Sequence, residues 1–95
     1  MIKDKEVAMV HAASYALDYL NEKYSADAEE IIKKFLKEFN SFEMKPELKI
    51  YSVAAISEIL KMKFANKTKT KKQLIQMFVN KNQEFLQKIE EASED

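Results

Sequence analysis

Apolar residues recur along this chain at the three- and four-residue spacing that is typical of amphipathic helices. The clearest repeat comes last, where Leu74, Ile75, Phe78 and Val79 begin a broad apolar face that continues to Ile89. The pattern predicts four helices, over residues 4–23, 26–40, 46–64 and 70–92. We therefore expect an all-α fold in which these helices form a small antiparallel four-helix bundle.

Helix-start signals support several of these boundaries. Ser25 is placed to cap the second helix, and Thr70 with Gln73 forms the capping box of the fourth. The third helix has two possible starts, because Pro46 is favoured in a first helical turn and Ser52 is a good N-cap. The sequence leaves both starts open.

Size and composition exclude several classes of protein. The 95 residues are enough for one domain (1–95), and they include no glycine, no cysteine and a single proline. Without glycine there can be no phosphate-binding glycine loop, dinucleotide fingerprint or nucleophile elbow. Without cysteine there is neither a disulfide nor a thiolate metal site. The acidic C-terminal residues, 90–95, are expected to fray.

No apolar run approaches the roughly 20 residues that a membrane-spanning helix needs, and the N-terminus lacks the apolar core of a signal peptide. We therefore expect a cytoplasmic protein without a membrane partner.

His11, Ser14 and Asp18 share one face of the first predicted helix, but their order does not suit a catalytic triad. The imidazole of a triad lies between the nucleophile and the carboxylate, whereas here the serine is central. The adjacent acids Glu29 and Glu30 diverge by about 100° on a helix. We expect the protein not to be an enzyme and to have no cofactor, metal or small-molecule substrate.

Charge is unevenly distributed, although 16 basic and 16 acidic residues give a net charge of zero. Residues 61–81 contain seven lysines and no acid, which makes them candidates for binding a polyanion. They are Lys61, Lys63, Lys67, Lys69, Lys71, Lys72 and Lys81. Three interpretations remain open: a solvated loop, a contact for phosphates of a nucleic acid, and a docking surface for an acidic protein.

The sequence Thr70-Lys71-Lys72-Gln73-Leu74-Ile75 places lysines before a hydrophobic helix, following an extended loop and an earlier helix. In this arrangement residues 57–78 resemble SAP-type DNA-binding modules, although they have neither the turn glycine nor the arginine that those modules commonly show. The resemblance implies contacts to the phosphate backbone. Because lysine lacks the planar fork of arginine, such binding would show little sequence preference.

Five other residues are candidates for a protein interface. Phe42 and Met44 lie in the polar link around the proline, where they would be exposed unless they fold back or bind a partner. Asn82, Phe85 and Ile89 belong to a heptad seam in the fourth helix, and a lone asparagine at an a position can fix the register of paired helices. The other phenylalanines, Phe64 among them, are expected in the core.

The sequence thus favours a small non-enzymatic interaction module that binds a protein partner or forms a homodimer. In size and predicted helix count it is similar to small adaptor-like immunity and inhibitor proteins. The alternative is a nucleic-acid-associated regulatory protein that contacts phosphates through residues 61–81.

Overall fold

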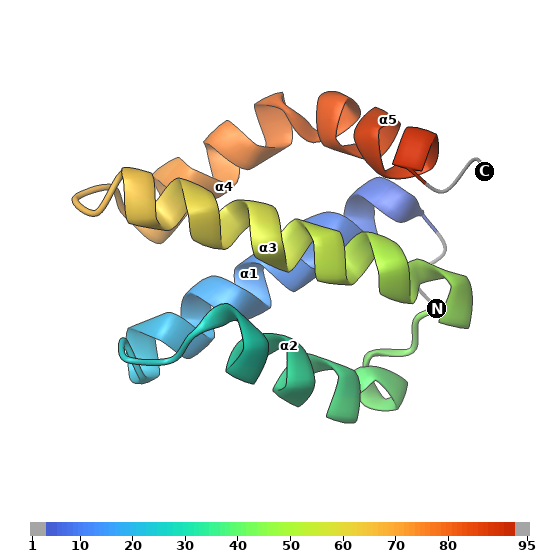
Figure 1. Ribbon diagram of the computed structural model, residues 1–95, viewed down its shortest axis with the longest axis horizontal. Coiled ribbons are helices and arrows are strands. Elements are labelled where there is room, and N and C mark those ends of the chain that lie inside the picture. The colour runs from blue at the N-terminus through green and yellow to red at the C-terminus, as the bar shows by residue number, and fades with distance from the viewer. Residues whose placement is uncertain (1–3, 93–95) are drawn as a thin grey trace.

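The computed structural model describes residues 4–92, whose regular structure is entirely helical (Figure 1). The described residues form α1 (Lys5–Glu22), α2 (Ala28–Lys37), the 3-10 helices η1 (Phe39–Phe42) and η2 (Pro46–Leu48), α3 (Lys49–Ala65), α4 (Lys71–Asn80) and α5 (Asn82–Ala92). The prediction of an all-α fold is confirmed. The radius of gyration of 12.6 Å is that of a single compact globule of this length.

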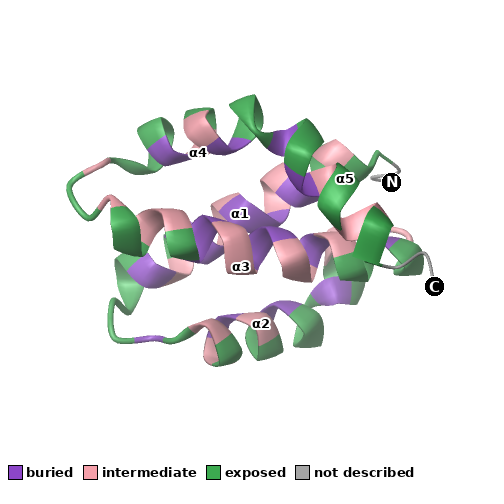
Figure 2. Cartoon of the chain, turned by 45° about the horizontal axis from the view of Figure 1, so that its top comes forward, coloured by how far each residue is buried: buried purple, intermediate pink, exposed green. Residues whose placement is uncertain are grey.

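Helices α1 and α3 form the central pair, and their contact is the most extensive between any two elements of the described chain. Helix α2 lies along one side of this pair, while α4 and α5 lie along the other side (Figures 1 and 2). Buried residues face inward from all of these helices, and exposed residues cover the outside (Figure 2).

Small residues explain why α1 and α3 approach so closely. Ala8, Ala12, Ala13 and Ala16 of α1 are fully buried. A helix face made of methyl groups lets a neighbouring backbone come near, and large side chains from the other elements fill the space beside it. The largest fully buried apolar side chains of the core, including Met9 of α1 itself, are Phe35, Phe39, Phe78, Met9, Ile31, Leu48, Ile56, Ile59, Leu60 and Leu74.

Helix ends in the first half of the chain differ from those predicted. Asp27, and not Ser25, caps α2, because its carboxylate accepts a hydrogen bond from the Glu30 amide at 2.8 Å. Helix α2 ends at Lys37 and the chain continues as the 3-10 helix η1, so the predicted end at residue 40 was too late. The segment from Pro46 is likewise 3-10, and α3 itself begins at Lys49.

The single fourth helix predicted over residues 70–92 is two helices, so the structure does not show a four-helix bundle. The break lies at Lys81, whose amide donates to the Phe78 carbonyl at 3.1 Å, a bond one residue shorter than an α-helical one. Phe78 and Phe85 lie on either side of the break, are both buried, and have ring centroids 5.3 Å apart. The ribbon changes direction between α4 and α5 (Figure 1), and both rings pack in the core on either side of this change.

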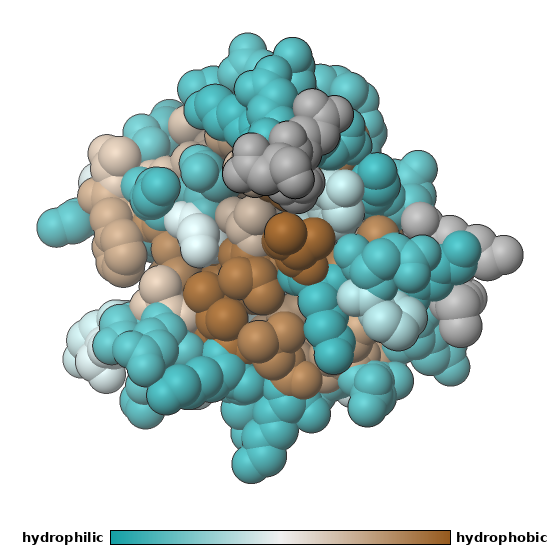
Figure 3. Space-filling view, turned by 45° about the vertical axis from the view of Figure 1, so that its right-hand side comes forward, coloured by the Kyte–Doolittle hydropathy of each residue, from teal (hydrophilic) through white to brown (hydrophobic). Residues whose placement is uncertain are grey.

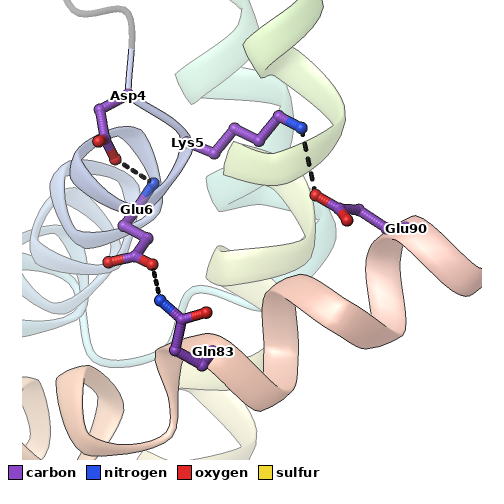
Figure 4. A network of polar contacts seen from close by, with 5 residues as sticks. All are labelled: Asp4, Lys5, Glu6, Gln83 and Glu90. Carbon is purple, nitrogen blue, oxygen red and sulfur yellow. Dashed lines mark hydrogen bonds and ion pairs between the residues drawn. The ribbon is translucent and has the colours of Figure 1, made fainter.

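Polar contacts join the first and last helices (Figure 4). The Lys5 ammonium lies 3.2 Å from a Glu90 carboxylate oxygen, and the Gln83 amide donates to Glu6. Asp4 caps α1 by accepting from the Glu6 amide at 2.8 Å. Helix α5 extends to Ala92, and residues 93–95 lie outside the described residues, so the fraying expected for 90–95 stays a prediction.

A second polar group joins α1 to α2. The Glu30 carboxylate accepts from the Lys23 ammonium at 2.7 Å and from the Tyr19 hydroxyl at 2.8 Å. Both bonds lower the pKa of Glu30, and the bond from Lys23 has the larger effect. One turn earlier in α1, the Tyr15 hydroxyl donates to Glu38, just after α2, at 2.5 Å. Burial and this bond raise the pKa of Tyr15.

The close α1–α3 contact predicts that Ala12→Leu destabilises the protein. The added methylenes have no space at a fully buried position, so the free energy of unfolding should fall by about 1–3 kcal/mol. Urea denaturation followed by circular dichroism measures this change. Ala92→Leu, at an exposed position in α5, is the matched control and should change stability by no more than about 0.5 kcal/mol.

Glu30 should contribute a pH-dependent share of stability. Its pKa is lowered in the folded state, so its contribution is complete above the ordinary value of 4.5 and is lost as the pH falls through the lowered value. Glu30→Gln should therefore reduce stability at neutral pH but have little effect at a pH well below the lowered pKa of Glu30. Glu29→Gln in the same helical turn is the control. An equal loss at both pH values for Glu30→Gln would contradict the assignment.

Candidate functional site

Four of the seven lysines of residues 61–81 come together around an open groove at one end of the molecule. The groove has a volume of about 770 Å³ and lies between the end of α1, the end of α3 and the start of α4. It is lined by Leu17, Asp18, Leu20, Asn21, Tyr24, Lys63, Phe64, Lys67, Lys69, Thr70, Lys71 and Leu74. We call this set of residues the lysine groove.

The loop that forms one wall of the lysine groove is held by its own hydrogen bonds. The Lys63 ammonium donates to the backbone carbonyls of Lys67 and Lys69, at 3.4 and 3.3 Å. The Asn66 side chain donates to the Met62 carbonyl at 2.9 Å. Lys63 therefore acts mainly in shaping the loop, and only part of its charge is available to a ligand.

The predicted capping box closes the start of α4. Thr70 accepts from the Gln73 amide at 3.2 Å, and the Gln73 side chain accepts from the Thr70 amide at 2.9 Å. Two of the free amides that a helix start could offer to a phosphate are thus already bonded within the chain.

The charges of the lysine groove are unequal in their availability. Lys71 forms an ion pair with Asp18 at 2.7 Å, which joins α4 to α1. Within residues 4–92, the side chains of Lys67 and Lys69 have no hydrogen-bond or ion-pair partner. These two ammonium groups are the cations most available to an anionic ligand.

The lysine groove also has an apolar part. Leu74 is fully buried and Leu17 and Leu20 are nearly so, which makes the floor apolar. Phe64 is 54% exposed and Tyr24 is 90% exposed, so two aromatic side chains are accessible beside the lysines. Large exposed aromatic residues next to a concave apolar surface are typical of binding sites.

Sequence reasoning missed both aromatic residues. The prediction that Phe64 belongs to the core was wrong, because it lies in the last turn of α3, beyond the region that neighbouring helices cover. Tyr24 could have been noticed from its position among polar residues between two helices, outside the apolar repeat.

The remaining lysines of the segment do not line the groove. Lys61 lies on the outward side of α3, where its ammonium is 3.7 Å from Glu58. Lys72 is exposed in the first turn of α4, and Lys81 is exposed at the break between α4 and α5. The run of seven lysines in sequence is thus divided between several surfaces.

The predicted protein-interface residues are largely covered in the monomer. Phe42 folds back and stacks on Phe35 with ring centroids 5.0 Å apart, and Met44 is 6% exposed. Asn82 and Phe85 are also buried, and Ile89 is half-buried against the core. A seam made by these three residues is therefore not an open surface.

His11, Ser14 and Asp18 do not come together as a chemical group. The His11 ring packs edge-on against the Phe42 ring, with ring centroids 4.9 Å apart. Burial lowers the pKa of this histidine. Asp18 is bonded to Lys71 at the lysine groove. Among residues 4–92, no three side chains of metal-binding types are grouped closely enough to hold an ion.

None of the helices in residues 4–92 combines the length and apolar character that crossing a bilayer requires.

Comparisons of the chain with protein-family models, with curated proteins and with solved structures found no match. Its function has to be inferred from the chemistry of its own residues.

Asn82 generates a prediction of its own, because its side-chain oxygen is buried without a hydrogen-bond partner among the described residues. An unpaired buried polar atom costs free energy, so Asn82→Leu should raise the free energy of unfolding by about 1 kcal/mol. The exposed neighbour Asn80→Leu is the control. A loss of stability in Asn82→Leu, measured by urea denaturation, would show that the asparagine has a stabilising role here.

Proposed function

We propose that the protein is a non-enzymatic interaction module that binds a partner protein in the lysine groove. The partner would present a segment that combines acidic side chains with apolar or aromatic ones. We further propose that it does so in the cytoplasm.

The observation that carries this proposal is the combination of an apolar floor with a lysine rim. Leu17, Leu20 and Leu74 offer a surface for apolar side chains. Beside that floor, the ammonium groups of Lys67 and Lys69 have no partner among residues 4–92. Acidic and apolar side chains on one segment would satisfy both parts of the groove at once.

Phe64 and Tyr24 strengthen the case for a binding surface. Aromatic side chains bury a large area at little cost in conformational entropy, and they are enriched among the residues that dominate binding energy. Their exposure beside the lysines places these anchors next to the available charges.

A second candidate function is binding of a single-stranded nucleic acid in the same groove. Tyr24 and Phe64 would stack on bases while Lys67 and Lys69 contact phosphates. Two features favour the protein partner: the apolar floor and the zero net charge of the whole chain. The binding experiment described next distinguishes the two candidate functions.

A displayed library of random peptides, selected against the intact protein, tests the proposal. Selected sequences should combine Asp or Glu with aromatic or aliphatic residues. Their affinity, measured by fluorescence anisotropy with synthetic peptides, should fall at least about tenfold in the double variant Lys67→Gln/Lys69→Gln, because two unpaired cations are lost. Phe64→Ser should weaken binding by removing the aromatic anchor.

The chain provides a matched control in Lys72→Gln/Lys81→Gln, which removes the same charge from the same lysine run but outside the groove. This variant should bind the selected peptides like the parent protein. Equal losses in both double variants would show that only net charge matters and would overturn the proposed site. Binding of a mixed-sequence single-stranded oligonucleotide, with affinity falling steeply as salt increases and no selected peptide family, would favour the second candidate.

A further inference from the structure

The outward side of α3 carries a stripe of residues at alternating three- and four-residue spacing. Starting in η2, one turn before the helix, it runs through Glu47, Ile50, Ala54, Ser57 and Lys61. This is the spacing of the a and d positions of a coiled coil. We call these five residues the α3 stripe.

Burial shows that the α3 stripe faces away from the core. The inward side of α3 is made of buried residues, namely Ser52, Ala55, Ile56, Ile59 and Leu60. On the outward side Ile50 is 54% exposed, and Ala54 and Ser57 are half-buried. The side chains of Glu47 and Lys61 at the two ends are 68% and 74% exposed.

The apolar character of this surface is unusual for the outside of a helix in a monomer. Ile50 and Ala54 lie on the outward side of α3, and Val53 lies beside them. None of the three is charged. Figure 3, in which the right-hand side of Figure 1 is turned toward the viewer, shows apolar residues gathered in one continuous area at the centre of that face, with hydrophilic residues around it. Such an area is typical of a protein contact surface.

We propose that the α3 stripe is a self-association surface on which a second copy of this chain docks, with the two α3 helices antiparallel. Ala54 lies at the crossing point and on the two-fold axis. The contact is isologous, so that each chain contributes the same residues.

The charges at the ends of the stripe select the second copy and its direction. Glu47 and Lys61 are each seven residues from Ala54, in opposite directions. In an antiparallel pair centred on Ala54, Glu47 of one chain therefore meets Lys61 of the other, at both ends of the contact. In a parallel pair like charges would meet instead, which is unfavourable.

Among the residues that the structure describes, both charges have only loose partners. The Glu47 carboxylate is 4.0 Å from the Lys45 ammonium, and the Lys61 ammonium is 3.7 Å from Glu58. Neither distance is that of a charge-assisted hydrogen bond. The two side chains can therefore turn to a new partner without losing a strong bond.

Small residues allow the close approach that this pairing needs. Ala54 and Ser57 lie at and beside the crossing point and have short side chains, while Ile50 supplies apolar area on either side of them. A contact of this kind is small by the standard of stable dimers, so the association should be weak and dependent on protein concentration. It does not use the lysine groove, and it stands whether or not the proposed function is correct.

Sedimentation equilibrium over a series of concentrations, from about 10 µM to about 1 mM, tests the proposal on the full chain. The apparent mass should rise from that of one chain, 11.1 kDa, toward twice that value. Ala54→Glu should abolish the rise, because it places two carboxylates at the crossing point. Circular dichroism should show that this variant remains folded, since Ala54 lies on the outward side of α3.

A charge exchange makes the test specific to antiparallel pairing. Glu47→Lys and Lys61→Glu should each weaken association at least about tenfold, because like charges then meet at both ends. The double variant Glu47→Lys/Lys61→Glu should restore it. Lys81→Glu, at an exposed lysine outside α3, is the matched control and should associate like the parent protein. A protein that is monomeric at every concentration, or a double variant that fails to recover, would overturn the proposal.

Discussion

The contact between α1 and α3 is the one on which the other elements depend. Four alanines of α1 are fully buried, and their small size lets the two helices approach closely. Helix α2 on one side and α4 with α5 on the other then bury their large side chains against this pair (Figure 2). Because the chain has no disulfide and no grouped metal ligands in residues 4–92, this packing has to supply the stability.

The helices themselves could be predicted from local signals, because apolar spacing and capping residues are read directly from the sequence. The capping box of Thr70 and Gln73 was identified in this way and is present in the structure. The break at Lys81 could not be predicted, since nothing near it is a glycine or a proline. It coincides with the packing of Phe78 and Phe85, on either side of the break, into the same core.

The lysine groove, too, could be predicted only in part from the sequence. Lysine enrichment in residues 61–81 was evident, but the sequence could not show which charges would be used within the fold. Lys63 shapes its own loop and Lys71 is paired with Asp18, a residue 53 positions earlier in the chain. The apolar floor comes from α1 as well as α4, so it exists only once distant segments have met.

The central position of α1 bears on how this protein folds. Its main partner, α3, begins at Lys49. The polar contacts at the start of α1 are with Gln83 and Glu90 of α5. These contacts are distant in sequence, so loop closure has to precede much of the stabilisation. During synthesis from the N-terminus, the alanine face of α1 would remain without its partner until α3 had emerged from the ribosome. We therefore expect the core to form late and in one cooperative step, and not helix by helix as the chain grows.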